Sequence, residues 1–286
     1  MILIASVILN YNDSETTISL IEAIRDYDSL NYIIVVDNNS TDDSVERIEK
    51  HVSEKVILIK NKKNGGYGYG NNIGIKYSYN ILKCDYTLII NPDVLFEEEI
   101  IDPLISAVEN NQNVSLVSCI PINPEKKLAP AWKEMNGFQD VLSASLIFNK
   151  LVSKRYYSND YIFKKPLTEV YQVPGSLILV DTSKMINYGM YDEDFFLYEE
   201  EKVIATKFKN NNLKSVLVTD YTYIHNHSVS VDKTFKSKVK PRKLLLESKY
   251  KFLKKYRKFN KLQLLLSSLF FRFCIFEMWL YSIIKK

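Results

Sequence analysis

The chain has 286 residues, of which 46% are hydrophobic and 25% charged, so it can bury one large core, or one core and an appendage. This composition excludes disorder as the default state. The net charge of +4 is unevenly divided, with −10 on residues 1–232 and +14 on residues 233–286, and the acidic first part argues against a nucleic-acid-binding protein.

The first 91 residues alternate apolar runs with helical patterns. Continuous apolar runs of strand length occur at residues 3–9 and 32–36, and residues 56–60 and 86–91 are predicted as two further strands. Amphipathic or capped patterns between them predict helices over residues 16–25, 41–50 and 71–82. Ser40 or Thr41 is expected to cap the second helix. Strands buried on both faces, with helices between them, predict an α/β fold with a mostly parallel central sheet.

The amino terminus runs directly into the first predicted strand. Residues 1–9 have no basic leader, so we expect a buried strand rather than a signal peptide. The three cysteines, Cys84, Cys119 and Cys274, lie far apart and have none of the paired spacings of zinc sites. We therefore expect a cytoplasmic chain without a structural metal cluster.

Polar residues follow each of the four predicted strands. They are Asn10-Tyr11-Asn12, Asp37-Asn38-Asn39-Ser40, the segment from Asn61 to Asn72, and Asn91-Pro92-Asp93. One such exit is ordinary turn chemistry, because Asn and Asp tolerate turn backbones and cap helices. Ligands of parallel sheets bind at the carboxyl ends of the strands. Four polar exits in succession therefore predict one shared crevice.

Five of the eight glycines lie in residues 64–74 (NGGYGYGNNIG). Such a segment lets backbone N–H groups approach an anion, and a helix beginning at Asn71 would direct its positive end at a diphosphate. The dinucleotide-binding spacing is absent, because Asn71 and Ile73 stand where the third glycine would be. No Gly-Lys-Ser/Thr triplet occurs either. A hydride-transferring Rossmann enzyme and a P-loop protein are therefore disfavoured.

Asp93 follows a buried strand through a proline turn. A carboxylate in this position suits Mg²⁺ or Mn²⁺ that also binds phosphate oxygens. The alternative is a cap on a helix over residues 94–99.

A second acidic segment, residues 192–201 (DEDFFLYEEE), follows a predicted strand at 176–180. Aromatic side chains before the three final carboxylates would anchor the segment and desolvate one acid, which raises its pKa toward that of a general base. The alternative is an acidic helix start whose buried face contains Val203, Ile204 and Phe208.

The basic tail alternates cationic and aromatic or apolar residues over 243–261, and 262–284 is apolar except for Arg272 and Glu277. A spanning helix needs about 20 nearly uncharged residues, and a central Arg costs at least about 2.5 kcal/mol. We therefore predict an α/β domain over 1–232 and a helical, amphipathic tail over 233–286 that lies on an anionic membrane surface. The alternative is a helical hairpin packed on the core or on a second copy in a homodimer.

Together these segments resemble the family 2 glycosyltransferases of the GT-A fold, in particular the rhamnosyltransferase-like and capsular-polysaccharide members. The resemblance covers about residues 5–230 and rests on SVILNYN, VVDNNSTDDS, NGGYGYGNNIG, INPDV, VPGSLILVDTSKM, YGMYDEDFFLYEEE and YIHNHSVS, in this order. It implies inverting, metal-dependent transfer of a sugar, rhamnose or another hexose, from a UDP- or dTDP-linked donor to a saccharide. It also implies Mn²⁺ or Mg²⁺, a lipid-linked acceptor, and cell-surface polysaccharide synthesis at the inner face of the membrane.

The resemblance also implies roles for individual residues. The nucleoside is expected at Asn10, Tyr11, Asp37 and Asn39, and the ribose and diphosphate at Gly66, Asn71 and Asn72. The metal is expected at Asp93 with Asn91 and His225, assisted by His227. The family's Glu-Asp pair falls on Glu200 and Glu201, of which Glu201 is the expected base. The Gln-x-x-Arg-Trp signature of processive relatives is absent, which implies transfer of one sugar per encounter.

Two other classes of function stay open at this point. One is a catalytically inactive sugar-nucleotide-binding protein, which donor hydrolysis with Mn²⁺ would exclude. The other is a membrane-associated scaffold, against which the polar strand ends already count.

Overall fold

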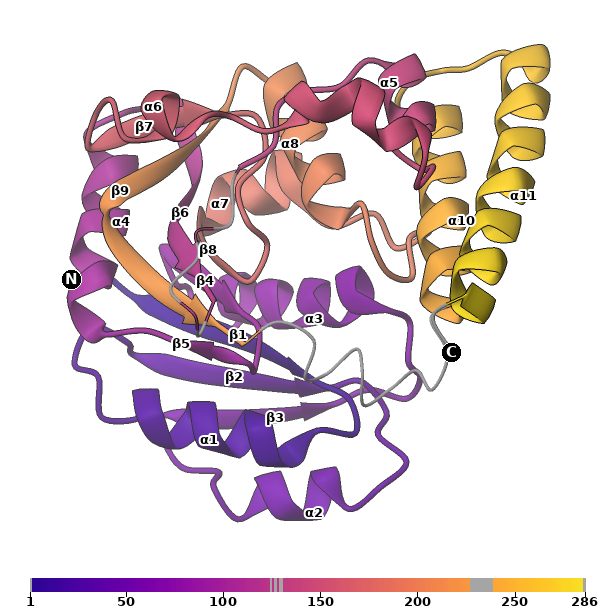
Figure 1. Cartoon of the computed structure of the whole chain (residues 1–286). Helices are drawn as coiled ribbons and strands as arrows, with labels where there is room; N and C mark the ends of the chain where they lie inside the picture. The colour runs from indigo at the N-terminus through magenta and orange to yellow at the C-terminus, as the bar shows by residue number, and fades with distance from the viewer. Residues whose placement is uncertain (1, 124, 126–127, 129–130, 227–238, 285–286) are drawn as a thin grey trace.

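A computed structural model of the chain describes residues 2–123, 125, 128, 131–226 and 239–284 (Figure 1). The strands are β1 (Ile4–Asn10), β2 (Tyr32–Asp37), β3 (Val56–Lys60), β4 (Tyr86–Ile90), β5 (Val94–Leu95), β6 (Val114–Ile122), β7 (Leu167–Val170), β8 (Leu177–Asp181) and β9 (Lys214–His225). The helices are α1 (Ser14–Ile24), α2 (Ser44–Glu49), α3 (Tyr67–Asn80), α4 (Ile101–Glu109), α5 (Gly137–Leu142), α6 (Asn159–Ile162), α7 (Thr182–Lys184), α8 (Glu200–Asn210), α10 (Val239–Lys255) and α11 (Lys261–Ile284). Short 3-10 or π turns are η1 (Glu98–Ile100), η2 (Phe148–Arg155) and η3 (Met185–Gly189).

The strands form one nine-stranded sheet in the order β3-β2-β1-β4-β8-β6-β9-β5, with β7 paired to β9. The part β3-β2-β1-β4 is parallel, as the apolar runs predict. Beyond β4 the sheet is mixed, because β8 is antiparallel to both β4 and β6. Figure 1 shows α1 and α2 below the parallel part and α3 above it. The fold is thus α/β with helices on both faces of a central sheet.

Apolar side chains bury both faces of the parallel strands. On β1, Ile4 and Ile8 point to the face covered by α1, whereas Ala5 and Val7 point to the face covered by α3. Gly74 lets α3 approach closely, because a Cβ at this position would collide with Val7. Each fully buried aliphatic side chain stabilises the fold by about 1.5–3 kcal/mol, so these strands form the rigid support for the loops at their carboxyl ends.

Three helix starts differ from those predicted from the sequence, and the smallest difference is in α1, which begins at Ser14, two residues early. Helix α3 begins at Tyr67 rather than at Asn71, because the backbone turns at Gly66, where φ is +94°, and the Tyr67 N–H donates to a distant carbonyl at Phe196. Helix α2 begins at Ser44, three residues after the predicted start. Ser40 does not cap it, because its N–H and hydroxyl both bind Asp37.

The proposed helix cap at Asp93 is also absent. Residues Val94–Leu95 form strand β5, which pairs with β9. This pairing excludes the helix over residues 94–99 and leaves the carboxylate of Asp93 free of a capping role.

Helices α10 and α11 form a hairpin that packs beside α5 (Figure 1). Leu246 and Leu253 of α10 pack with Phe271 of α11 and with α5. Phe252 is fully buried against Phe195 and against α8. The packed hairpin, an alternative left open by the sequence, is therefore present, whereas residues 227–238 and the predicted division at residue 232 lie outside the described part.

Candidate active site

Side-chain hydrogen bonds join the carboxyl ends of β1 and β2. Asn10 Nδ2 donates to Asp37 Oδ1 at 2.8 Å and to Ser40 Oγ at 3.1 Å. Asp37 Oδ2 accepts the Ser40 N–H at 2.9 Å. Asn10 and Asp37 are both buried, so they hold the two loops in place. Among the predicted nucleoside residues, Tyr11 is partly exposed and Asn39, with φ of +63°, is exposed.

The exits of β2 and β3 and the glycine segment are joined in the same way. Asn61 Nδ2 donates to Asn38 Oδ1 at 3.0 Å. Asn38 Nδ2 donates to Asn64 Oδ1 at 2.9 Å and to the Gly66 carbonyl at 3.0 Å. These bonds confirm that the polar strand exits meet at one edge of the sheet.

The glycine segment approaches residues 191–196 of its own chain. A Cβ on Gly66 would collide with the Phe196 carbonyl, so glycine is required there. Asn72 Oδ1 accepts the Tyr191 N–H at 2.9 Å, and its Nδ2 donates to the Tyr191 carbonyl at 3.0 Å. Asn71 is buried, and its Oδ1 has no partner among the described residues. Of the residues predicted at the diphosphate, Asn71 therefore has an Oδ1 that could accept a hydrogen bond from a ligand. The side chain of Asn72 is instead used to bind the backbone of Tyr191.

Asp93 and His225 come together through the pairing of β5 with β9. Val94 lies opposite His225 in the register, and Asp93 Oδ1 is 3.3 Å from His225 Nε2. The Asp93 carboxylate is nearly buried, at 8% exposure, which places a negative charge where few waters reach it. His227 lies outside the described residues.

The donor set at this point fits a divalent cation in part. A carboxylate and an imidazole are both ligands of Mn²⁺, and two protein ligands leave coordination positions for phosphate oxygens. Asn91, the third predicted ligand, has its Oδ1 hydrogen-bonded by the Tyr67 hydroxyl at 3.0 Å. Across the described ranges, no group of three or more His, Cys, Asp or Glu side chains is arranged to hold a metal.

The backbone turns sharply before the acidic end of α8. Tyr198 and Glu199 both have positive φ, at +75° and +72°, an uncommon conformation for residues with a Cβ. Glu199 then points away from the next two acids and pairs with Lys202 Nζ at 2.8 Å and Lys249 Nζ at 3.0 Å. Although burial alone would raise it, these two cations lower the pKa of Glu199 to about 2.

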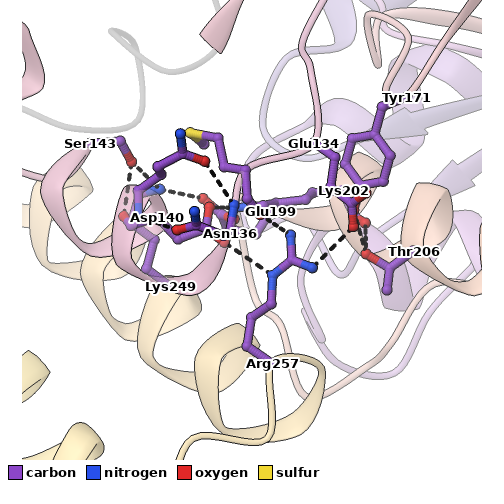
Figure 2. Close-up of polar contacts among 12 residues, drawn as sticks. Glu134, Asn136, Asp140, Ser143, Tyr171, Glu199, Lys202, Thr206, Lys249 and Arg257 are labelled. Carbon is purple, nitrogen blue, oxygen red and sulfur yellow. Dashed lines mark hydrogen bonds and ion pairs between the residues drawn. The ribbon is translucent and has the colours of Figure 1, made fainter. Parts of the chain in front are cut away.

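Figure 2 shows that buried charges from α5, α8 and α10 meet at this turn. Lys202 also contacts Asp140 of α5, and Arg257, just past α10, lies 3.3 Å from the second Asp140 oxygen. Breaking a buried pair of this kind leaves an uncompensated charge at a cost of about 3–5 kcal/mol. The network thus fixes the turn at residues 198–199 from three elements that are distant in sequence.

Glu200 and Glu201 occupy different environments. Glu200 is buried, its Oε1 has no partner within the described structure, and desolvation followed by repulsion from Glu201 raises its pKa well above the usual range. Glu201 is less buried and lies directly against Gly175, where a Cβ would collide with its carboxylate. Desolvation raises the pKa of Glu201, and His225 opposes that rise. Glu200 is thus a buried acid, and α8 begins at it with Val203, Ile204 and Phe208 buried, as the alternative of an acidic helix start predicts. The role of either acid as a general base stays a prediction.

These acids border a cavity of about 470 Å³. Its walls are formed by Tyr67 and Asn91, by the three acids of residues 199–201, and by the aromatic residues Trp132 and Tyr156. Other lining residues come from the tail and from η2: Arg155, Arg242, Leu245 and Lys249. The sequence indicates Asn91 and the acids as site residues, but it carries no local signal for the tail residues, because nothing in residues 239–249 predicts contact with a strand exit.

Comparison with known proteins places this geometry among sugar-transferring enzymes. The family model described as "Glycosyl transferase family 2" matches residues 6–183. The low-salt glycan biosynthesis hexosyltransferase Agl10 of Haloferax volcanii is 26% identical over 223 residues, which are 78% of this chain and 67% of Agl10. The rhamnosyltransferase WbbL of Escherichia coli K12 is 23% identical over 224 residues, 77% of this chain and 81% of WbbL.

The fold also matches solved structures. That of GalNAc-T7 with UDP, GalNAc and Mn²⁺ aligns with a TM-score of 0.62 at 13% identity, and it covers 79% of this chain. This chain spans only 44% of the length of that structure. At this identity the match concerns the fold alone.

Proposed function

This chain belongs to glycosyl transferase family 2 and has the GT-A fold, and from that premise we propose that it transfers one sugar per encounter, with inversion, from a nucleotide diphosphate donor to a saccharide acceptor. The observation that carries the proposal is that one cavity borders both Asn91, beside Asp93, and the acids Glu200 and Glu201. A leaving group and a base can thus act on opposite sides of one sugar carbon.

In the proposed donor site, Tyr11 and Asn39 contact the nucleoside, while Asn10 and Asp37 hold the loops that present them. Gly66, Asn71 and Asn72 lie along the ribose and diphosphate. The unused Oδ1 of Asn71 supports this assignment, because a buried acceptor without a donor is costly and a ribose hydroxyl would satisfy it. The UDP of the GalNAc-T7 structure supports a UDP-linked donor, with dTDP as the related alternative.

In the proposed reaction, Glu201 accepts the proton of the acceptor hydroxyl while the oxygen attacks the anomeric carbon and the nucleoside diphosphate leaves. Glu201 suits this role because its carboxylate lies at the cavity wall and desolvation raises its pKa, which makes it a stronger base than an exposed glutamate. Glu200 is more deeply buried and holds its proton more tightly. A single displacement of this kind inverts the configuration.

Asp93 and His225, with Asn91 beside them, would hold Mn²⁺ or Mg²⁺, which when bound supplies positive charge to the diphosphate. The Mn²⁺ in the GalNAc-T7 structure supports this cofactor. The names of Agl10 and WbbL support a hexose such as rhamnose and a role in surface polysaccharide synthesis.

The experiment that tests the proposal is release of nucleoside diphosphate from a panel of UDP-, dTDP- and GDP-sugars by the full chain with Mn²⁺. We expect slow hydrolysis of one donor class, because water can replace the acceptor hydroxyl in the cavity. Binding of a donor without any hydrolysis or transfer would instead indicate an inactive sugar-nucleotide-binding protein.

We also propose that the enzyme works on the inner face of the membrane, where the tail meets a lipid-linked acceptor. Helix α11 is apolar and long enough to span a bilayer over Lys261–Ile283, with 22% of its apolar window buried. However, Glu277 accepts hydrogen bonds from the Ser145 hydroxyl and the Leu146 N–H, which ties α11 to the segment after α5. This favours a helix lying on the surface over one that spans the membrane.

The outer face of α11 continues into a wider apolar surface. It is formed by exposed residues of α11 and of the segment after α5: Leu262, Leu265, Leu266, Leu269, Phe276, Trp279, Ile283, Ile147 and Leu151. A soluble monomer rarely exposes so many neighbouring apolar side chains. The tail's excess of Lys and Arg complements anionic headgroups, which supports a lipid partner over a second copy of this chain.

Replacing Leu265, Leu269 and Trp279 together by glutamine is expected to weaken binding to vesicles with 30% phosphatidylglycerol by at least about tenfold. Binding of the unaltered chain should also weaken as salt rises. The control is a double Gln variant at exposed Val52 and Ile81, far from the tail. Equal sedimentation of all three proteins would exclude the membrane role. Substitutions are preferable to a cut after residue 232, which would remove buried Phe252 and the partner of Glu199.

A further inference from the structure

Arg242, a cation of the cavity wall, forms no ion pair with an acidic side chain among the described residues. Arg242 lines the cavity from the first turn of α10, and its Nε and one terminal nitrogen are buried without an acceptor among the described residues. A buried donor without an acceptor costs about 1–3 kcal/mol, and more when it is charged. A cation in the first turn is also disfavoured by the helix dipole. The placement of Arg242 therefore lowers the stability of the protein when no anion is bound in the cavity.

The neighbouring charges do not remove this cost. Lys202 of α8 and Lys249 of α10 also line the cavity, and both pair with Glu199, while Lys202 pairs with Asp140 as well. Glu277 of α11 attracts Arg242 electrostatically, but its carboxylate oxygens are hydrogen-bonded by residues 145–147. Arg242 therefore keeps unmatched donors that an anion in the cavity would satisfy.

We propose that Arg242 forms an anion subsite in the acceptor half of the cavity, which binds a phosphate group carried by the acceptor. The guanidinium presents its N–H groups in a planar fork that matches a phosphate bidentately. Arg155 lines the same cavity from η2, where it donates to Asn149 Oδ1 at 2.6 Å and stacks on Tyr156. It provides a second positive charge for the same anion.

This inference rests on the proposed function and makes the acceptor more specific. The acceptor hydroxyl must lie beside Glu201, on one wall of the cavity. Arg242 lies on the wall formed by α10, which packs against α11. An acceptor bound between them places its sugar at Glu201, its phosphate at Arg242, and any lipid chain toward the apolar surface of α11. A neutral saccharide would leave the guanidinium unsatisfied.

The test is calorimetric titration of the full chain with geranyl phosphate, inorganic phosphate and uncharged geraniol. EDTA is included so that no metal at Asp93 binds the phosphate. Arg242→Gln is expected to weaken geranyl phosphate binding by about 10- to 100-fold, the usual effect of losing a charge-assisted hydrogen bond, and to leave geraniol unaffected. The matched control is Arg272→Gln, which removes the same charge from an exposed position on α11.

Each outcome decides a separate point. Tighter binding of geranyl phosphate than of inorganic phosphate indicates a lipid-borne acceptor, and equal binding indicates a water-soluble phosphorylated one. Unchanged affinity in Arg242→Gln, or an equal loss in Arg272→Gln, overturns the subsite. The circular dichroism spectrum and the melting temperature of Arg242→Gln should match those of the unaltered chain, which shows that the variant is folded. If the unaltered chain hydrolyses no donor, the proposed function fails while the phosphate titration still decides this inference.

Discussion

Glu201→Gln is expected to lower sugar transfer by about 10³-fold, while donor affinity changes by less than about twofold, because only removal of the hydroxyl proton needs the carboxylate. Glutamine has nearly the same shape, so the close contact with Gly175 is kept. The measurement is kcat and KM for transfer, with donor binding followed separately by calorimetry.

Glu200→Gln is the matched control for this experiment. Burial raises the pKa of Glu200 well above its usual range, which favours the protonated carboxyl, and the amide of glutamine has nearly the same shape. We expect a loss of transfer below about tenfold. If Glu200→Gln abolishes transfer and Glu201→Gln does not, the base is Glu200. If both variants keep full activity, the base lies elsewhere.

Asp93→Ala is expected to weaken Mn²⁺-dependent binding of the donor nucleotide by about 100-fold, since it removes one of the two side chains, Asp93 and His225, that we propose as strong metal ligands. The strand pairing should survive, because Asp93 accepts the Asn226 N–H through its backbone carbonyl, which alanine keeps. Calorimetric titration with UDP or dTDP, with Mn²⁺ and then with EDTA, measures the effect. The loss should vanish in EDTA.

The control for Asp93 is Asp220→Ala, which removes an exposed carboxylate of β9 away from the cavity. Its Mn²⁺-dependent affinity should equal that of the unaltered chain. His225→Ala should also weaken the Mn²⁺-dependent binding of the nucleotide, because the Asp93 and His225 side chains lie 3.3 Å apart. Unchanged affinity in Asp93→Ala with Mn²⁺ present would refute the metal site.

Local sequence pattern was sufficient for the parallel half of the sheet and for the strand-end crevice. Residues 3–9, apart from Ser6, and residues 32–36 are apolar, a pattern typical of strands buried on both faces. Asn10 and Asp37 directly follow these two runs, so the pattern also locates the strand ends. The acidic run after Phe195 and Phe196 was recognisable for the same reason, since aromatics beside carboxylates predict desolvation.

Tertiary structure decided what depends on residues far apart in the chain. The start of α3 moved to Tyr67 because a carbonyl at Phe196 accepts its N–H, and no local propensity contains that partner. Glu199 looks like its neighbours in sequence, yet its backbone has a positive φ and its carboxylate pairs with Lys202 and Lys249. Residues 233–286 contain sixteen Lys and Arg residues, and charge alone does not distinguish Arg242 from the others. Arg242 stands out because α10 places it at the cavity wall, where its Nε has no acceptor among the described residues. Charge and hydropathy are properties of a segment, whereas burial and partners are properties of a position in the folded chain.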